Sequence, residues 1–238
     1  LNWVANGGTT TSNTNGSITS TVQANTTAGF SIVTYSGSND STVTWGHGLS
    51  SSPEWVLIKR LEGSGWRTYH KSVGLGSYLS ITGTNAATSS TVDFASVSST
   101  TFGVKGGNNP VSASGQTYVA YCWHGVDGFS KFGSYTGNGN ADGPTVYLGF
   151  KPAWLMIKRS NAAANWYIID TKRDPTNPTG QHNLQADNTA AESSITGLAS
   201  IDILSNGFKN RQGTGTGINN SGDTYVYMAF AEHPFVGD

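Results

Sequence analysis

The hydrophobic residues of this chain fall into short runs that predict β-strands. In four of the runs, apolar side chains occupy successive positions on both faces of the expected strand, which indicates a central strand that is covered on two sides. These four runs are Trp55–Lys59, Tyr118–Trp123, Trp154–Lys158 and Tyr225–Phe230. No segment keeps an apolar spacing of about 3.6 residues for long enough to predict a helix.

Weaker strands are expected between these runs, at Trp66–Tyr69, Tyr78–Thr82 and Thr101–Lys105. Turns rich in glycine, serine and asparagine separate the expected strands at intervals of about 8–12 residues. This spacing is typical of an antiparallel β-sandwich or a jelly roll.

The chain also repeats itself once. Residues 53–60, PEWVLIKR, return as residues 152–159, PAWLMIKR, with five of eight positions identical at a spacing of 99. The block GFSIVTYSG recurs as GFSKFGSYTG, and the block GQTYVAYCW recurs as GDTYVYMAF. Because the blocks keep the same order, they indicate an internal duplication.

The duplication predicts an all-β chain of two tandem, homologous, jelly-roll-like antiparallel β-sandwich domains, residues 29–126 and 127–238. Residues 1–28, rich in Thr, Asn and Gly, are interpreted as an extended leader outside both repeats. The offset between the repeats grows from 99 to 107, so the second repeat carries extra residues. Its segment Arg173–His182, with two prolines and a glycine, is interpreted as an exposed loop that holds them.

Composition narrows the class of protein. Gly, Ser, Thr and Asn make up 109 of the 238 residues, and charged residues make up 11%, against about 25% in ordinary domains. Seven Trp, ten Tyr and nine Phe supply the material for a packed core, which excludes a disordered chain. The formal net charge of −1 argues against nucleic acid or an anionic membrane surface as partner, and no apolar run is long enough to insert into a membrane.

For the residues that could catalyse a reaction or bind a metal, the surrounding sequence favours a structural role. His47 lies in a Gly-His-Gly turn that the second repeat lacks, so a turn residue is favoured over a metal ligand. Cys122 lies in an apolar strand, where a buried thiol is favoured over a nucleophile. Residues 137–143 carry a single carboxylate, which favours a Gly/Asn turn over a calcium loop. We therefore expect no catalytic residue, no metal and no cofactor.

One charged feature recurs in both repeats. The pairs Lys59-Arg60 and Lys158-Arg159 each follow directly on a predicted buried strand. Their side chains are expected to face water or to pair with a neighbouring subunit.

Aromatic residues divide into two groups. Tryptophans that recur in both repeats are expected in the core, where burial of a ring contributes most. They are Trp55, Trp66, Trp154 and Trp166. Aromatic residues without a counterpart are expected in exposed loops, where a flat ring and nearby amide groups can bind a carbohydrate. The candidate ligand-binding residues are Trp45, Tyr69, Tyr78 and Tyr167.

Several blocks of the chain resemble a family of phage proteins. The blocks are GHGLSSSPEWVLIKR, YVAYCWHGVDGFSKFGSYTGNGNADGP, KPAWLMIKR, NWYIIDTKRDPTNP, LSNGF and TYVYMAFAEHPF. They resemble repeated modules in uncharacterised structural proteins of tailed bacteriophages, notably of marine and cyanobacterial phages, from Ala5 to Phe235. The resemblance implies a virion component of a tail fibre, spike or other appendage, with the tail favoured over the capsid.

The resemblance implies other virion proteins and further copies of this chain as partners, with a trimer as the expected symmetry. It supplies no catalytic or binding residues. Three functions stay open: an adhesin that presents loops to a host-surface glycan, a capsid decoration or assembly protein that binds no receptor, and a polysaccharide depolymerase. A depolymerase needs two converging carboxylates. The acidic residues are mostly unmatched between the repeats, and Glu54 aligns with Ala153, so we expect no enzyme.

Overall fold

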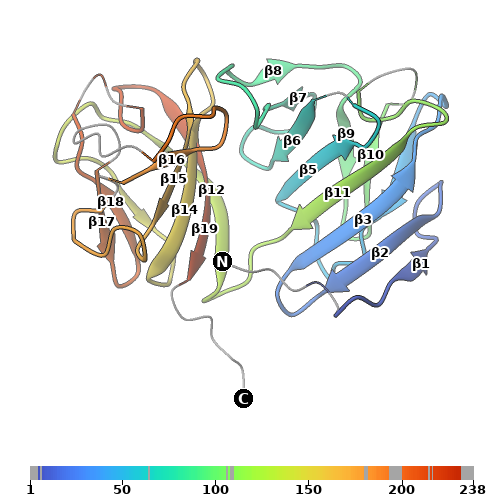
Figure 1. The fold of residues 1–238 in the computed structure, drawn as a ribbon, viewed down its shortest axis with the longest axis horizontal. Helices are drawn as coiled ribbons and strands as arrows, with labels where there is room; N and C mark the ends of the chain where they lie inside the picture. The colour runs from blue at the N-terminus through green and yellow to red at the C-terminus, as the bar shows by residue number, and fades with distance from the viewer. Residues whose placement is uncertain are drawn as a thin grey trace. The chain divides into compact units, whose positions relative to one another are not determined.

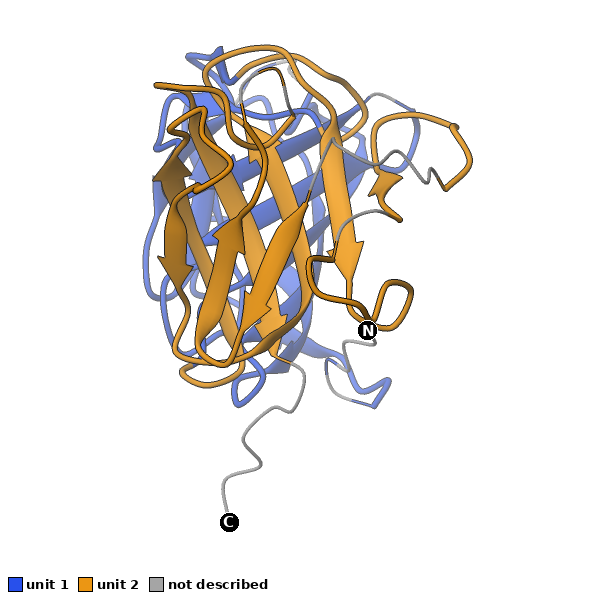
Figure 2. Ribbon diagram, turned by 90° about the vertical axis from the view of Figure 1, so that its left-hand side faces the viewer, with its two compact units in different colours: residues 1–80, 87–126 blue, residues 81–86, 127–238 orange. Residues whose placement is uncertain are grey.

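The computed structural model describes residues 5, 7–63, 65–105, 107, 110–179, 182–192, 200–213, 215 and 217–231. The described residues form an all-β structure of several antiparallel sheets, without a helix (Figure 1). Accordingly, this part of the chain offers no helix that is long and apolar enough to cross a bilayer. The chain forms two compact units, coloured separately in Figure 2: unit 1 is residues 1–80 and 87–126, and unit 2 is residues 81–86 and 127–238.

Unit 1 contains a six-stranded sheet, a three-stranded sheet and a short hairpin. In spatial order, the larger sheet is β1 (Thr11–Asn13), β2 (Ser20–Asn25), β3 (Phe30–Ser36), β11 (Thr117–Trp123), β5 (Trp55–Arg60) and β6 (Trp66–His70). The smaller sheet is β4 (Val43–Gly46), β10 (Thr101–Val104) and β9 (Phe94–Val97). The hairpin is β7 (Ser77–Tyr78) and β8 (Thr88–Ser89).

Unit 2 contains a five-stranded and a three-stranded sheet. The larger sheet is β12 (Ser130–Thr136), β19 (Thr224–Ala231), β14 (Pro152–Arg159), β15 (Trp166–Asp170) and β16 (Leu184–Gln185). The smaller sheet is β13 (Thr145–Tyr147), β18 (Gly207–Asn210) and β17 (Ile201–Leu204). The order β12-β19-β14-β15 is the counterpart of β3-β11-β5-β6, and β13-β18-β17 is the counterpart of β4-β10-β9.

Each unit has its core between its two sheets, which gives it a β-sandwich-like character. In unit 1, the larger sheet contributes Val33 and Ile58, and the smaller sheet contributes Phe102. In unit 2, Ile157 of the larger sheet and Phe208 of the smaller sheet belong to one buried cluster. Alternate residues of a strand point to opposite faces, so each sheet buries one face in this core.

The strands predicted from the four long apolar runs are confirmed as β5, β11, β14 and β19, each with a partner on both sides. The weaker predictions at 66–69 and 101–105 are confirmed as β6 and β10. The strand expected at 78–82 is wrong beyond Tyr78, where β7 ends. Residues 81–86 belong instead to unit 2, as an irregular segment that contains Gly83.

The core of unit 1 is centred on two stacked tyrosines. Tyr35 of β3 and Tyr118 of β11 are directly paired across the sheet, with ring centroids 5.0 Å apart and an interplanar angle of 8°. The Tyr35 hydroxyl donates to the carbonyl of Val111 at 3.0 Å, and the Tyr118 hydroxyl accepts from the N–H of Ala113 at 2.9 Å. Both hydroxyl groups therefore hold the loop that precedes β11.

Unit 2 contains the same arrangement. Tyr135 of β12 pairs with Tyr225 of β19, with ring centroids 5.1 Å apart and an interplanar angle of 13°. The Tyr135 hydroxyl donates to the carbonyl of Ile218 at 2.8 Å, and the Tyr225 hydroxyl accepts from the N–H of Asn220 at 2.9 Å. The loop that precedes β19 is thus held in the same way as the loop that precedes β11.

The interpretation of residues 1–28 as a leader outside the repeats is wrong for residues 11–25. These residues form β1 and β2, and β2 pairs along its length with β3. Val22 of β2 lies in the core of unit 1, and the Ser20 hydroxyl donates to the carbonyl of Gly46 at 2.7 Å. The alternation of small polar and apolar residues in STVQAN is a strand pattern with one buried face.

The turn between β1 and β2 also packs against the smaller sheet. The N–H of Ile18 donates to the carbonyl of Thr44 in β4 at 3.2 Å. A Cβ atom at Gly16 would lie 2.3 Å from the same carbonyl oxygen. Because both partners are backbone, this contact has little freedom to relax.

We therefore predict that Gly16→Ala lowers the free energy of unfolding by about 1–3 kcal/mol, the usual range for overpacking. The matched control is Gly65→Ala, where the nearest atom to the new Cβ is the Arg67 guanidinium at 3.7 Å, an ordinary contact. Urea unfolding of both variants measures the difference. Equal stability of the two variants would contradict the packing of the β1–β2 turn on β4.

Candidate functional site

The expectation of exposed loop aromatics is wrong for three of the four candidate residues. Trp45 on β4 is fully buried, Tyr69 on β6 is 8% exposed and Tyr167 on β15 is 5% exposed. All three belong to the cores of their units, and the Trp45 ring lies 4.1 Å from that of Tyr35. Rings in these positions cannot lie flat beneath a sugar.

The fourth candidate, Tyr78, is half-buried at the end of β7. The guanidinium of Arg67 lies over its ring, 4.2 Å from the centroid. One face of the ring is therefore already covered by a cation.

The recurring tryptophans divide between the core and the surface. Trp55 and Trp166 are buried as expected. Trp66 and Trp154 are only half-buried, so the expectation of core positions is wrong for these two.

The expectation that the recurring basic pairs face water or a neighbouring subunit is wrong for Lys158. Its side chain is fully buried. Its ammonium donates to the carbonyls of Thr84 at 3.0 Å and Ala164 at 2.8 Å, all within unit 2. Burial lowers the Lys158 pKa to about 8. Its neighbour Arg159 pairs with Asp223 at 2.6 Å.

The interpretation of His47 as a turn residue is supported by its hydrogen bonds. Its Nδ1 accepts from the N–H of Leu49 at 3.1 Å, which leaves Nε2 to donate to the carbonyl of Ser98 at 3.2 Å. Both ring nitrogens of this buried, neutral imidazole are therefore occupied. Burial lowers the His47 pKa to about 4. The hydrogen bond to the Ser98 carbonyl opposes this shift, and the nearby His124 adds to it.

Two other candidates from the sequence, Cys122 and the segment 137–143, also lie in surroundings that explain them as structural residues. Cys122 is fully buried in β11, and burial raises the pKa of its thiol. In the segment 137–143, Asn140 accepts a hydrogen bond from the N–H of Asp142, and Asp142 pairs with Lys209 at 2.7 Å. The described residues contain no group of three or more His, Cys, Asp or Glu that could hold a metal ion.

A concave site lies within unit 2, beside the long loop between β15 and β16. This loop covers residues 171–183, whereas the corresponding connection from β6 to β7 in unit 1 covers only residues 71–76. It contains the segment Arg173–His182 that the sequence predicts as an insertion. Its described residues, 173–179 and 182, are confirmed as a loop, but Asp174 and Thr179 among them are buried.

Asp170, at the end of β15, sets the start of this loop. Its carboxylate accepts from the N–H groups of Lys172 at 3.0 Å and Arg173 at 2.9 Å, and it pairs with the Arg173 guanidinium. Partial burial opposes ionisation of Asp170, but these hydrogen bonds outweigh it and lower the pKa of the carboxyl. The first turn of the loop is thereby fixed by a charged group.

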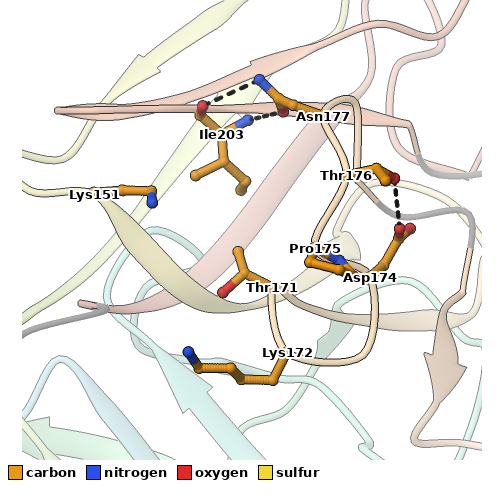
Figure 3. Close-up of a pocket in the computed structure, with 8 residues that line it drawn as sticks. All are labelled: Lys151, Thr171, Lys172, Asp174, Pro175, Thr176, Asn177 and Ile203. Carbon is orange, nitrogen blue, oxygen red and sulfur yellow. Dashed lines mark hydrogen bonds between the residues drawn. The ribbon is translucent and has the colours of Figure 1, made fainter.

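The middle of the loop is fixed to β17. The Asn177 side chain accepts from the N–H of Ile203 at 2.8 Å and donates to the carbonyl of the same residue at 3.4 Å (Figure 3). Thr179 forms a backbone bridge with Ile201, and its hydroxyl donates to the Asp174 carbonyl at 2.8 Å. The loop is therefore held on both sides of Pro178.

Between the loop and β17 lies a pocket of about 380 Å³, within the size range of small-molecule sites. Figure 3 shows the side chains that line it. They are Lys151, Thr171, Lys172, Asp174, Pro175, Thr176, Asn177 and Ile203. This set combines two ammonium groups, one carboxylate, hydroxyl and amide groups, and the apolar surfaces of a proline and an isoleucine, which suits a polar ligand with one apolar face.

Of these lining residues, the sequence points only to Asp174, as one of the acidic residues that a depolymerase could use. The available signal was the insertion itself, an extra loop with Asn, Thr and Pro next to two lysines. A glycoside hydrolase needs two carboxyl groups about 5–9.5 Å apart, and the described lining of this pocket supplies one, Asp174.

The neutral state of His47 generates a prediction for stability. The pKa of about 4 in the folded chain lies below the unfolded value of 6.5, so the unfolded chain takes up the proton first as the pH falls. The stabilising contribution is complete above pH 6.5 and declines as the pH falls towards 4. The full difference is about 3 kcal/mol.

Urea unfolding of the wild type and of His47→Asn, measured from about pH 7.5 to about pH 4, tests this contribution. Asparagine keeps an acceptor for the Leu49 N–H but does not titrate. We expect a steeper loss of stability with falling pH in the wild type than in the variant. The same slope in both proteins would contradict the assignment.

Comparison with known proteins identifies a family. Residues 1–234 match the model of a domain of unknown function, DUF7483. No curated protein and no solved structure matches the chain. Since the match covers nearly its whole length, the chain belongs to the DUF7483 family.

Proposed function

We propose that this chain is a binding module of a tailed-bacteriophage appendage, a tail fibre or spike, and that it attaches to a glycan on the host surface. The phage assignment rests on the resemblance of the sequence blocks. The observation that carries the binding role is the pocket between the β15–β16 loop and β17. Its walls are fixed by Asp170 and Asn177 before any ligand is present, so little ordering is needed on binding.

We further propose that the two units arose by duplication of one jelly-roll-like sandwich. The matching strand orders support this proposal, and so do the stacked tyrosine pairs at the same ladder positions. In this interpretation unit 1 keeps the short connection and unit 2 acquired the loop that forms the pocket. The specialised copy binds, and the other serves as a structural support.

In the virion, the module would contact other appendage proteins and further copies of itself, with a trimer as the expected symmetry. Low charge and many small polar side chains are compatible with close contacts between subunits. A decoration or assembly protein without a receptor is the alternative, and such a protein would have no use for a preformed polar pocket.

Binding to a microarray of bacterial surface polysaccharides tests the proposed function. We expect the full chain to bind a subset of the polysaccharides and Asn177→Ala to lose most of the signal, because the loop then loses both hydrogen bonds to Ile203. Asn140→Ala, which removes an amide from an exposed turn outside the pocket, is the matched control. Absence of binding, or equal binding by both variants, would contradict the proposal.

A further inference from the structure

The lining of the pocket has an excess of positive charge in a chain that has few charges. Lys and Arg total 13 of 238 residues, yet Lys151 and Lys172 line one pocket of about 380 Å³. Both residues are exposed. Figure 3 shows their nitrogen atoms on the same side of the pocket, with Thr171 between them in that view. The site is therefore polarised, with its cationic groups at one side.

The acidic residues near this pocket have hydrogen-bond or ion-pair partners within the chain. Asp170 is bound to Arg173, which also pairs with Glu192 at 3.2 Å. Asp174 is 4% exposed, and its carboxylate accepts from the Thr176 hydroxyl at 3.0 Å and lies 3.9 Å from the His182 ring. No carboxylate of the described residues pairs with Lys172.

A second observation points to a missing oxygen partner. The Thr171 hydroxyl is buried and has no hydrogen-bond partner among the described residues, although Thr171 lines the pocket. A buried hydroxyl without a hydrogen-bond partner destabilises the folded chain, so such groups normally have a partner. A ligand oxygen beside Thr171 would remove this destabilisation.

On the basis of the proposed function, we infer that the pocket binds an acidic sugar residue. The anionic group of the sugar lies between the ammonium groups of Lys151 and Lys172, and a neighbouring ring oxygen accepts from the Thr171 hydroxyl. The apolar face of the sugar ring packs against Pro175 and Ile203. A carboxylate, a sulfate ester and a phosphate ester share the required charge, so the experiment distinguishes them.

The test measures binding to four oligosaccharide probes by calorimetry. They are an oligogalacturonate, its fully methyl-esterified and therefore neutral form, a sulfated galactan oligosaccharide and a phosphorylated mannan oligosaccharide. We expect at least one acidic probe to bind about tenfold or more tightly than the neutral ester, and its affinity to fall as salt is raised. The acidic probe that binds best identifies the anionic group.

Variants then locate the charge. Lys172→Met and Lys151→Met should each weaken binding of the acidic probe by about tenfold, the effect of losing one charge-assisted contact. Lys105→Met removes one charge from an exposed position in unit 1 and should leave binding unchanged. Because both pocket lysines are exposed, these variants are not expected to disturb folding, which thermal unfolding verifies.

The outcomes separate the two proposals. Equal binding of the acidic and neutral probes, with loss on Asn177→Ala, overturns the acidic ligand and leaves glycan binding by the pocket intact. Binding of an acidic probe that survives both lysine substitutions also overturns this inference. Failure of every glycan, here and on the polysaccharide array, overturns the proposed function as well.

Discussion

The stacked tyrosine pair is the interaction on which each unit depends. The two rings of each pair lie on adjacent strands of the larger sheet, and each hydroxyl also binds the loop before the unit's last strand. Burial raises the pKa of Tyr35 and Tyr135, so their hydroxyl groups stay protonated donors. Strand pairing, loop position and inner packing are therefore determined together.

The central strands of both units can be predicted from the sequence, because they are continuous apolar runs whose side chains need to be buried on both faces of the sheet. The exposure of single aromatic residues does not follow. In the smaller sheet of unit 1, Trp45 pairs with Phe102. At the equivalent position of unit 2, Val146 pairs with Phe208. Likewise Tyr69 opposite Val56 corresponds to Ile169 opposite Leu155. A buried position accepts different apolar side chains, so a missing counterpart does not indicate a surface position.

The pocket could be predicted only in part, because it depends on contacts between residues far apart in the chain. Composition marks Arg173–His182 as an inserted loop, yet the pocket exists because Asn177 reaches Ile203, 26 residues away. Lys158 gives the same lesson, since its burial depends on Thr84, 74 residues earlier. Local pattern identifies the segments, and tertiary contacts decide which of their charges remain in water.

The burial of Cys122 has a practical consequence. It is the single cysteine of the chain, and it lies inside β11 with a thiol that burial keeps protonated and inaccessible. Reactive labels attack the thiolate of accessible cysteines. A cysteine introduced at the rim of the pocket, for example at Thr176, would thus be labelled selectively, and a fluorophore there would report occupancy of the site without removal of any native residue of the core.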